Sequence, residues 1–213
     1  MTLGPRETWG VVLRLALWLP LLLWTTWIWG WHYAHFFNPL YQYVLNHLLD
    51  GLQVGDIQLI HTREYMFSAP YVVEAMQVIH GHFISRNMDG SVQQPIYYAL
   101  THPIVLATAA LVWPGLSWKG RILRLLVSLP VLLLLEAVDI PLIIYSSIND
   151  ILIQTFDPKG YLASRPIDWV RLLEGGGRFA LCIAAAFMAA GMHKAKRPPP
   201  SSRSTQAIGL VAR

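Results

Sequence analysis

The run from Ile122 to Tyr145 constrains the fold of this chain more than any other feature, because it is almost entirely apolar and long enough to cross a membrane. A helix needs about 20 residues to span the hydrocarbon core of a bilayer. The same run carries two carboxylates, Glu136 and Asp139, at i, i+3 spacing. Each costs about 2.5–3.5 kcal/mol at the centre of a membrane helix, so each is expected to face protein or water and to have a partner.

Three further apolar segments accompany this run. They extend from Val11 to Trp31, from Ile96 to Trp113 and from Phe179 to Met192. Hydrophobic residues make up 54% of the chain and charged residues only 13%, a composition too apolar for an ordinary soluble domain. The pattern predicts an all-α membrane bundle of four transmembrane helices, with a small extracytoplasmic β element between the first and second helices.

Basic residues in the short flanks of the segments predict the orientation of the bundle. They form three clusters on one side: Arg6 and Arg14; Lys119, Arg121 and Arg124; and Lys194, Lys196 and Arg197. By the positive-inside rule this side is cytoplasmic, so both termini are expected on the cytoplasmic side of the membrane. A cleavable signal peptide is the alternative for the first segment. The sequence "WHYAHFF" after it offers no small-x-small cleavage site, which favours an uncleaved anchor.

The order of the segments divides the chain into six parts. Residues 1–31 comprise the cytoplasmic end and the first membrane helix, and residues 32–95 an outer amphipathic helix followed by the β element. Residues 96–145 hold the second and third membrane helices with a short basic turn between them. Residues 146–177 form an outer loop, residues 178–193 the fourth membrane helix, and residues 194–213 a disordered, basic, proline-rich tail. The basic part of the tail is expected to attract anionic lipid.

The two outer regions carry local structure signals. From Asn38 to Gly51, apolar residues recur at helical spacing and predict an amphipathic helix lying near the membrane surface. The Val- and Ile-rich residues that follow predict two to four strands, with Asp89-Gly90 as a hairpin-type turn. In the second outer loop "DPKGY" predicts a turn, and Pro166 begins a short amphipathic helix that a run of glycines ends.

Four ionisable residues from three membrane segments are expected at one depth near the outer face. They are His102, Glu136, Asp139 and Arg178. The i, i+3 spacing puts the two carboxylates on one helix face, where they are expected to meet Arg178 and His102. We favour a buried ion-pair group that fixes the helix register. The alternative is a site that uses a carboxylate as a base or binds an anion at Arg178, since intramembrane ionisable groups often mark substrate or proton pathways.

Other reactive side chains give weaker signals. Cys182 is the only cysteine, which excludes a thiol–disulfide exchange enzyme that needs cysteine pairs. Six histidines are expected on the outer side: His32, His35, His47, His61, His80 and His82. Their spacings could chelate zinc or copper, but there is no HExxH motif and no local carboxylate or cysteine pattern, so we favour ordinary interfacial and loop histidines. The basic residues form no stripe interleaved with aromatics, so we expect no nucleic-acid partner. We also expect no cofactor.

The motifs also point to a family. The first helix contains "LWLPLLLW", an outer extended segment follows, and "QPIYYALTHPIVLATAAL" returns to the membrane before a basic turn, a third helix and a terminal anchor. Over residues 13–192 this order resembles the exosortase H-associated membrane proteins of Gram-negative bacteria. An exosortase relies on Cys, Arg and His at the outer face, whereas Cys182 is expected inside the fourth helix. The resemblance implies an accessory protein with a membrane partner, such as a sorting transpeptidase, and without transpeptidase chemistry of its own.

These observations predict a non-enzymatic, multi-pass inner-membrane accessory protein that binds a membrane partner in surface-protein sorting or envelope-complex assembly. One alternative is a membrane enzyme or transporter that uses the outer-leaflet cluster of His102, Glu136, Asp139 and Arg178. A second alternative is an outer-face metal-binding protein.

Overall fold

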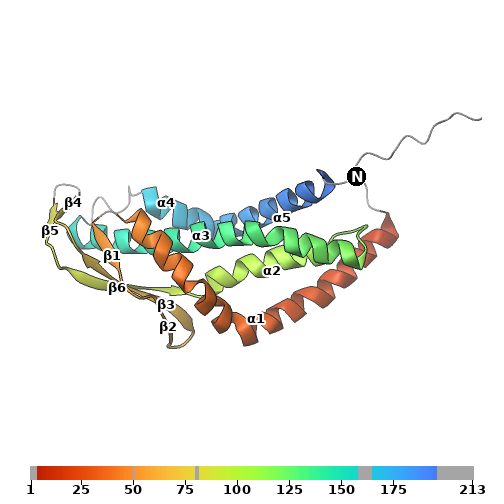
Figure 1. Ribbon diagram of the computed structural model, residues 1–213, viewed down its shortest axis with the longest axis horizontal. Helices are drawn as coiled ribbons and strands as arrows, with labels where there is room; N and C mark the ends of the chain where they lie inside the picture. Colours follow the sequence, from red (N-terminus) through yellow and green to blue (C-terminus); the bar gives the residue numbers. More distant parts are fainter. Residues whose placement is uncertain (1–3, 50, 80–81, 158–164, 196–213) are drawn as a thin grey trace, which may run out of the picture.

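The helices of the chain run along its long axis, and a small sheet lies at one end (Figure 1). The structure is a computed structural model that describes residues 4–49, 51–79, 82–157 and 165–195. Its α-helices are α1 (Pro5–Leu48), α2 (Tyr97–Val112), α3 (Trp118–Phe156), α4 (Arg165–Leu172) and α5 (Arg178–Ala195). The predicted turn at "DPKGY", beyond Asp157, and the tail from Lys196 onward lie outside the described residues.

Helices α2, α3 and α5 pack side by side, and α1 contacts both α2 and α3 (Figure 1). Helices α1 and α3 are each long and apolar enough to cross a membrane, and α2 is a shorter apolar helix. Helix α3 continues for eleven residues past Tyr145, the expected outer end of its span. At about 1.5 Å per residue this extension adds roughly 17 Å, on which the sheet can pack.

The amphipathic helix expected at Asn38–Gly51 is not a separate element on a membrane surface. Its residues continue α1, which runs through Pro39 to Leu48. Figure 1 shows the N-terminal part of α1 in red and its C-terminal part in orange, running in different directions. Pro39 removes one helical hydrogen bond. Burial of Tyr41 and Leu45 on the face that meets the sheet and α3 explains why the helix continues nevertheless.

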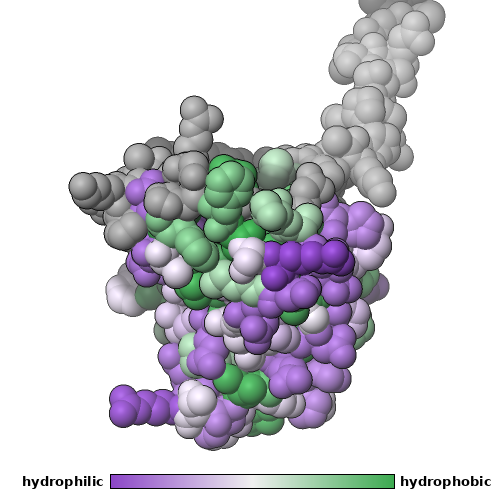
Figure 2. Space-filling view, turned by 90° about the vertical axis from the view of Figure 1, so that its left-hand side faces the viewer, coloured by the Kyte–Doolittle hydropathy of each residue, from purple (hydrophilic) through white to green (hydrophobic). Residues whose placement is uncertain are grey.

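The predicted small β element after the first helix is confirmed, but it is larger than two to four strands. A four-stranded sheet contains β1 (Leu52–Val54), β2 (Gln58–His61), β3 (Tyr65–Val73) and β6 (Asp89–Pro95). The long strand β3 is central, with β1 and β2 along one edge and β6 antiparallel along the other. A separate hairpin is formed by β4 (Gln77–Ile79) and β5 (His82–Ile84). Figure 2 views this end of the molecule, where hydrophilic residues cover most of the surface around a smaller hydrophobic group.

The turn expected at Asp89-Gly90 does not form at these residues. Asp89 and Gly90 lie within β6, paired with Val72 and Tyr71 of β3. The chain reverses just before them, where Asn87 adopts a left-handed conformation with φ of 67°. Asparagine tolerates this region better than most residues. A Cβ on Gly90 would lie 2.6 Å from the ring of Tyr71, so glycine serves close packing here rather than a turn.

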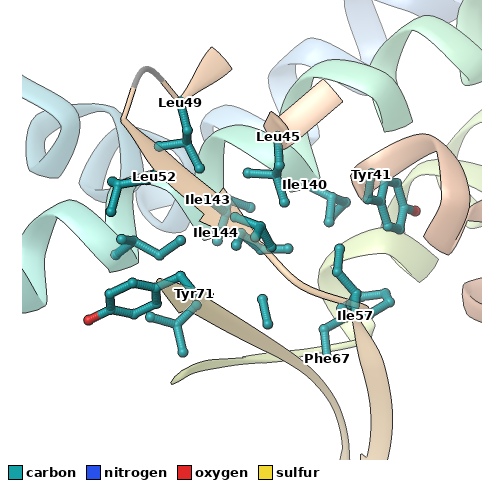
Figure 3. Close-up of a cluster of buried hydrophobic side chains, with 14 of the residues drawn as sticks. Tyr41, Leu45, Leu49, Leu52, Ile57, Phe67, Tyr71, Ile140, Ile143 and Ile144 are labelled. Carbon is teal, nitrogen blue, oxygen red and sulfur yellow. The ribbon is translucent and has the colours of Figure 1, made fainter. Parts of the chain in front are cut away.

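The main core lies between the sheet and the outer parts of α1 and α3. In Figure 3, Tyr41 and Leu45 of α1 and Leu49 just after it face three isoleucines of α3: Ile140, Ile143 and Ile144. On the other side the core is closed by Ile57, Phe67 and Tyr71. This core holds the sheet against the outer end of the bundle. It therefore fixes the rotation of α1 and α3 about their axes just beside Glu136 and Asp139.

The expected second outer loop is helical in its first part, because residues 146–156 continue α3, and the short helix predicted at Pro166 is found as α4 (Arg165–Leu172). The segment η2 (Leu173–Gly177), which is kinked at the non-helical Gly176, joins α4 to α5. Gly176 in that segment has φ of 105°, which an L-residue with a side chain rarely adopts. The glycine run therefore redirects the chain so that α5 begins at Arg178.

Candidate functional site

A buried cluster of polar side chains joins the helices at the outer part of the bundle. Nδ1 of His102 on α2 lies 3.0 Å from Oε1 of Glu136, and its Nε2 lies 2.9 Å from Oδ2 of Asp139. Nε of Arg178, at the start of α5, donates to the same Oδ2 at 2.8 Å. The structure thus brings together all four residues of the predicted cluster, and each is at most 6% exposed.

Two tyrosines complete the cluster, and sequence reasoning missed both. Tyr33 donates its hydroxyl hydrogen to Oε1 of Glu136 at 2.6 Å, and Tyr41 donates to Oε2. Both lie on one face of α1 together with Phe37, whose ring packs at a tilt against Tyr33 and stacks on Tyr41. The i, i+4 repeat of aromatic residues at 33, 37 and 41 was the available signal. It was obscured because the first membrane helix was expected to end at Trp31 and a separate surface helix was expected from Asn38 to Gly51.

The hydrogen bonds of His102 fix the number of protons in the cluster. A neutral imidazole offers one N–H donor and one acceptor, and an ionised carboxylate can only accept. Both ring nitrogens contact carboxylate oxygens. Therefore either the imidazole is protonated or one carboxylic acid is. In both cases the shared proton and Arg178 together balance the two negative charges, which is the condition for burying such groups at low cost.

Two features distinguish the Asp139 and Arg178 side of the cluster. Oδ1 of Asp139 is buried and has no hydrogen-bond partner among the described residues. The guanidinium of Arg178 lies 4.1 Å from the ring centroid of Tyr98, a cation–π contact, and the Tyr98 hydroxyl donates to Glu174 at 3.0 Å. The start of α5 is thereby tied to α2 by a second route besides His102.

Cys182 lies one turn after Arg178 on α5 and is fully buried. Its thiol is close enough to Asp139, Arg178 and Glu136 to feel their charges. Nucleophilic catalysis needs a thiolate that a substrate can reach. The burial of Cys182 denies that access.

The outer histidines do not form a metal centre within the described residues. No group of three or more His, Cys, Asp or Glu side chains in this part of the chain could hold a metal ion. Nδ1 of His47 lies 2.7 Å from the carbonyl oxygen of Tyr43, and the rings of His32 and His61 contact Trp29 and Tyr65. His80 lies outside the described residues. The metal-binding hypothesis thus gains no support from the described geometry and stays a prediction.

Comparison with known proteins adds no family to this picture. No protein-family model, no curated protein and no solved structure matches the chain. Function must therefore be inferred from the site and the surfaces of the protein itself.

Proposed function

We propose that this protein is a non-enzymatic, multi-pass membrane protein that binds a membrane partner in surface-protein sorting or envelope-complex assembly. One observation carries the non-enzymatic part. The cluster of His102, Glu136, Asp139 and Arg178 joins α2, α3 and α5, and it is buried and internally bonded. Tyr33 adds α1 to it by donating to Glu136. A catalytic group must reach a substrate atom, whereas a polar cluster that only holds helices together is most favourable when it is buried and its groups are hydrogen-bonded to one another.

The distribution of apolar side chains supports the membrane location. No residue in the most apolar stretch of α1 is buried within the molecule. Large exposed apolar side chains also lie along α3, including Leu133 and Leu134, and along α5, including Phe179 and Phe187. Soluble monomers rarely expose continuous apolar faces of this kind, so lipid or partner helices must cover them. We assign α1, α2, α3 and α5 as four spans of a bacterial inner membrane, with both termini cytoplasmic.

The sheet end offers a surface for the partner outside the membrane. Val78 and Phe83 are directly paired across the β4–β5 hairpin, so their side chains share one face, and both are exposed. Met76, just before the hairpin, is exposed as well. An exposed apolar group surrounded by hydrophilic surface is typical of an interaction site. The resemblance of the sequence to exosortase-associated proteins supports a sorting transpeptidase as the partner.

The test is purification of the tagged protein from its own membranes in native nanodiscs, with identification of bound proteins by mass spectrometry. We expect a membrane protein at a fixed stoichiometry with the parent chain, and its loss from a Val78→Ser/Phe83→Ser variant. A Tyr43→Ser variant, altered at an exposed position on α1, is the matched control and should keep the partner. Recovery of the intact protein alone, or turnover of a defined substrate by the purified chain, would argue against the proposal.

A second candidate function is a membrane enzyme or transporter that moves a proton through the cluster. The specific observation in its favour is that both ring nitrogens of His102 contact carboxylate oxygens, beside Oδ1 of Asp139, which has no partner among the described residues. Glu136→Gln separates the two candidates. A proton-handling site predicts normal protein abundance with lost activity, whereas a structural cluster predicts reduced abundance.

A further inference from the structure

A second group of buried charges lies at the opposite end of the bundle. Arg121 and Arg124 are at i, i+3 on the first turns of α3, and they are only 7% and 3% exposed. Arg14 of α1 lies close enough for its positive charge to act on Arg121. Trp18 of α1 and Trp118 of α3 stack beside this group, with ring centroids 6.0 Å apart.

These arginines lack the anion that buried arginines normally have. Nε of Arg121 and both Nε and Nη1 of Arg124 are buried without a hydrogen-bond acceptor, and in the described part of the chain no carboxylate pairs with either. Within the described residues, the guanidinium carbon of Arg124 lies 4.3 Å from the ring centroid of Trp113. Burial of an unpaired charge is strongly unfavourable, so these donors point to an anionic ligand.

An apolar groove adjoins the same tryptophan. It has a volume of about 390 Å³, is open to the outside, and lies between α1 and the C-terminal half of α2. Its walls include Val11, Leu15 and Leu19 of α1, Val105 and Ala109 of α2, and Trp113 just after α2. Apolar walls cannot hold an anion, but they suit a hydrocarbon chain. Trp113 therefore connects a site for negative charge with a site for an acyl chain.

We infer that this end of the bundle binds one anionic phospholipid, whose phosphate accepts hydrogen bonds from Arg121 and Arg124 while an acyl chain fills the groove between α1 and α2. Guanidinium groups recognise phosphate through charge-assisted hydrogen bonds. The inference rests on the proposed membrane topology, in which this end lies at the cytoplasmic leaflet, where anionic lipids attract basic residues. A free phosphate would satisfy the arginines but would leave the groove empty.

The test uses native mass spectrometry of the full chain titrated with phosphatidylglycerol, phosphatidylcholine or inorganic phosphate. We expect phosphatidylglycerol to bind at least about tenfold more tightly than phosphatidylcholine, as two charge-assisted hydrogen bonds allow. Arg121→Gln/Arg124→Gln should abolish this preference. Lys119→Gln, which removes an exposed charge two residues before Arg121, should keep it. Lys196→Gln/Arg197→Gln measures any contribution from the tail.

A groove variant keeps the inference falsifiable if the arginine variant folds poorly. Val105→Trp fills the groove, so it should weaken long-chain phosphatidylglycerol at least about fivefold and leave a short-chain analogue unaffected. Equal binding of the two lipids by the parent chain would overturn the inference, and so would tight, arginine-dependent binding of inorganic phosphate alone. Flotation of the protein with vesicles after an alkaline wash checks separately that the protein is integrated into the membrane. A protein that stays in the vesicles without a lipid preference refutes only the lipid site.

Discussion

The hydroxyl of Tyr33 lies 2.6 Å from Oε1 of Glu136, although the two residues are 103 positions apart in the sequence. This contact ties α1 to α3 at the level where His102 ties α2 to α3 and Arg178 ties α5 to α3. Glu136 and Asp139 are therefore the shared partners of three other helices. A substitution at either carboxylate should therefore lower the stability of the whole bundle rather than weaken a single pair of residues.

Replacement of Glu136 by Gln should destabilise the protein by about 3 kcal/mol or more. The change removes the charge that faces His102 and two tyrosine hydroxyls, and breaking a buried pair on one side costs about 3–5 kcal/mol. Thermal unfolding in detergent and the abundance of the protein in membranes measure the effect. Glu64→Gln, at an exposed turn, should leave both unchanged. A Glu136→Gln protein of unchanged stability would contradict the structural role of the cluster.

The two tyrosines should differ in importance. Tyr41→Phe should cost about 1.5–3 kcal/mol, because it removes the donor to Oε2 of Glu136, an atom with no other donor in the described residues. Tyr33→Phe should cost less, because His102 also contacts Oε1. Tyr43→Phe on the same helix is exposed and should be neutral. The reverse order, measured by denaturant or thermal unfolding, would show that the hydrogen bonds do not set the cost.

Arg178 and Asp139 should be energetically coupled. Arg178→Gln leaves Asp139 without its nearest permanent cation, and Asp139→Asn leaves Arg178 without its carboxylate. The double variant should therefore be less destabilised than the sum of the two single variants, by about 1–3 kcal/mol. A double-mutant cycle of unfolding free energies gives this value. Simple additivity would mean that the pair contributes nothing specific to the bundle.

Gly176→Ala should destabilise the junction of α4 and α5 by about 1–2 kcal/mol. Gly176 has φ of 105°, while a Cβ added there would meet no atom within 4 Å, so the cost is conformational rather than steric. Gly175→Ala is a matched control, because its Cβ is equally free and its backbone is in an ordinary conformation. Unfolding midpoints measured side by side should fall only for the Gly176 variant. Equal midpoints for the two variants would contradict the conformational role.

The cluster could be predicted from sequence because charge in an apolar segment is costly. Glu136 and Asp139 required partners, and His102 and Arg178 were the ionisable residues at matching depth on neighbouring segments. Tyr33 and Tyr41 were missed for a related reason. Their helix was expected to end near Trp31, so no depth within the bundle was assigned to them. Only the continuation of α1 through Pro39, stabilised by packing against the sheet, brings them to Glu136.

The sheet shows where local patterns are insufficient. Strand β6 has the sequence DGSVQQP, which contains few residues with a preference for strands, and Val92 is its only buried residue. Its conformation comes from pairing with β3 along seven positions, a contact between residues distant in the sequence. Gly90 was expected in a turn, but the same pairing places it in close contact with Tyr71. Register of this kind depends on tertiary packing, which periodicity alone does not specify.

The most direct test of the proposed four-span bundle is the accessibility of single cysteines on the two sides of the membrane. In a Cys182→Ala background, Glu64→Cys and Lys119→Cys introduce thiols at exposed positions on either side of α2. A membrane-impermeant maleimide applied to intact spheroplasts should label Glu64→Cys at once and Lys119→Cys only after permeabilisation. Labelling of both positions from the same side would contradict the proposed topology, because α2 would then not cross the membrane.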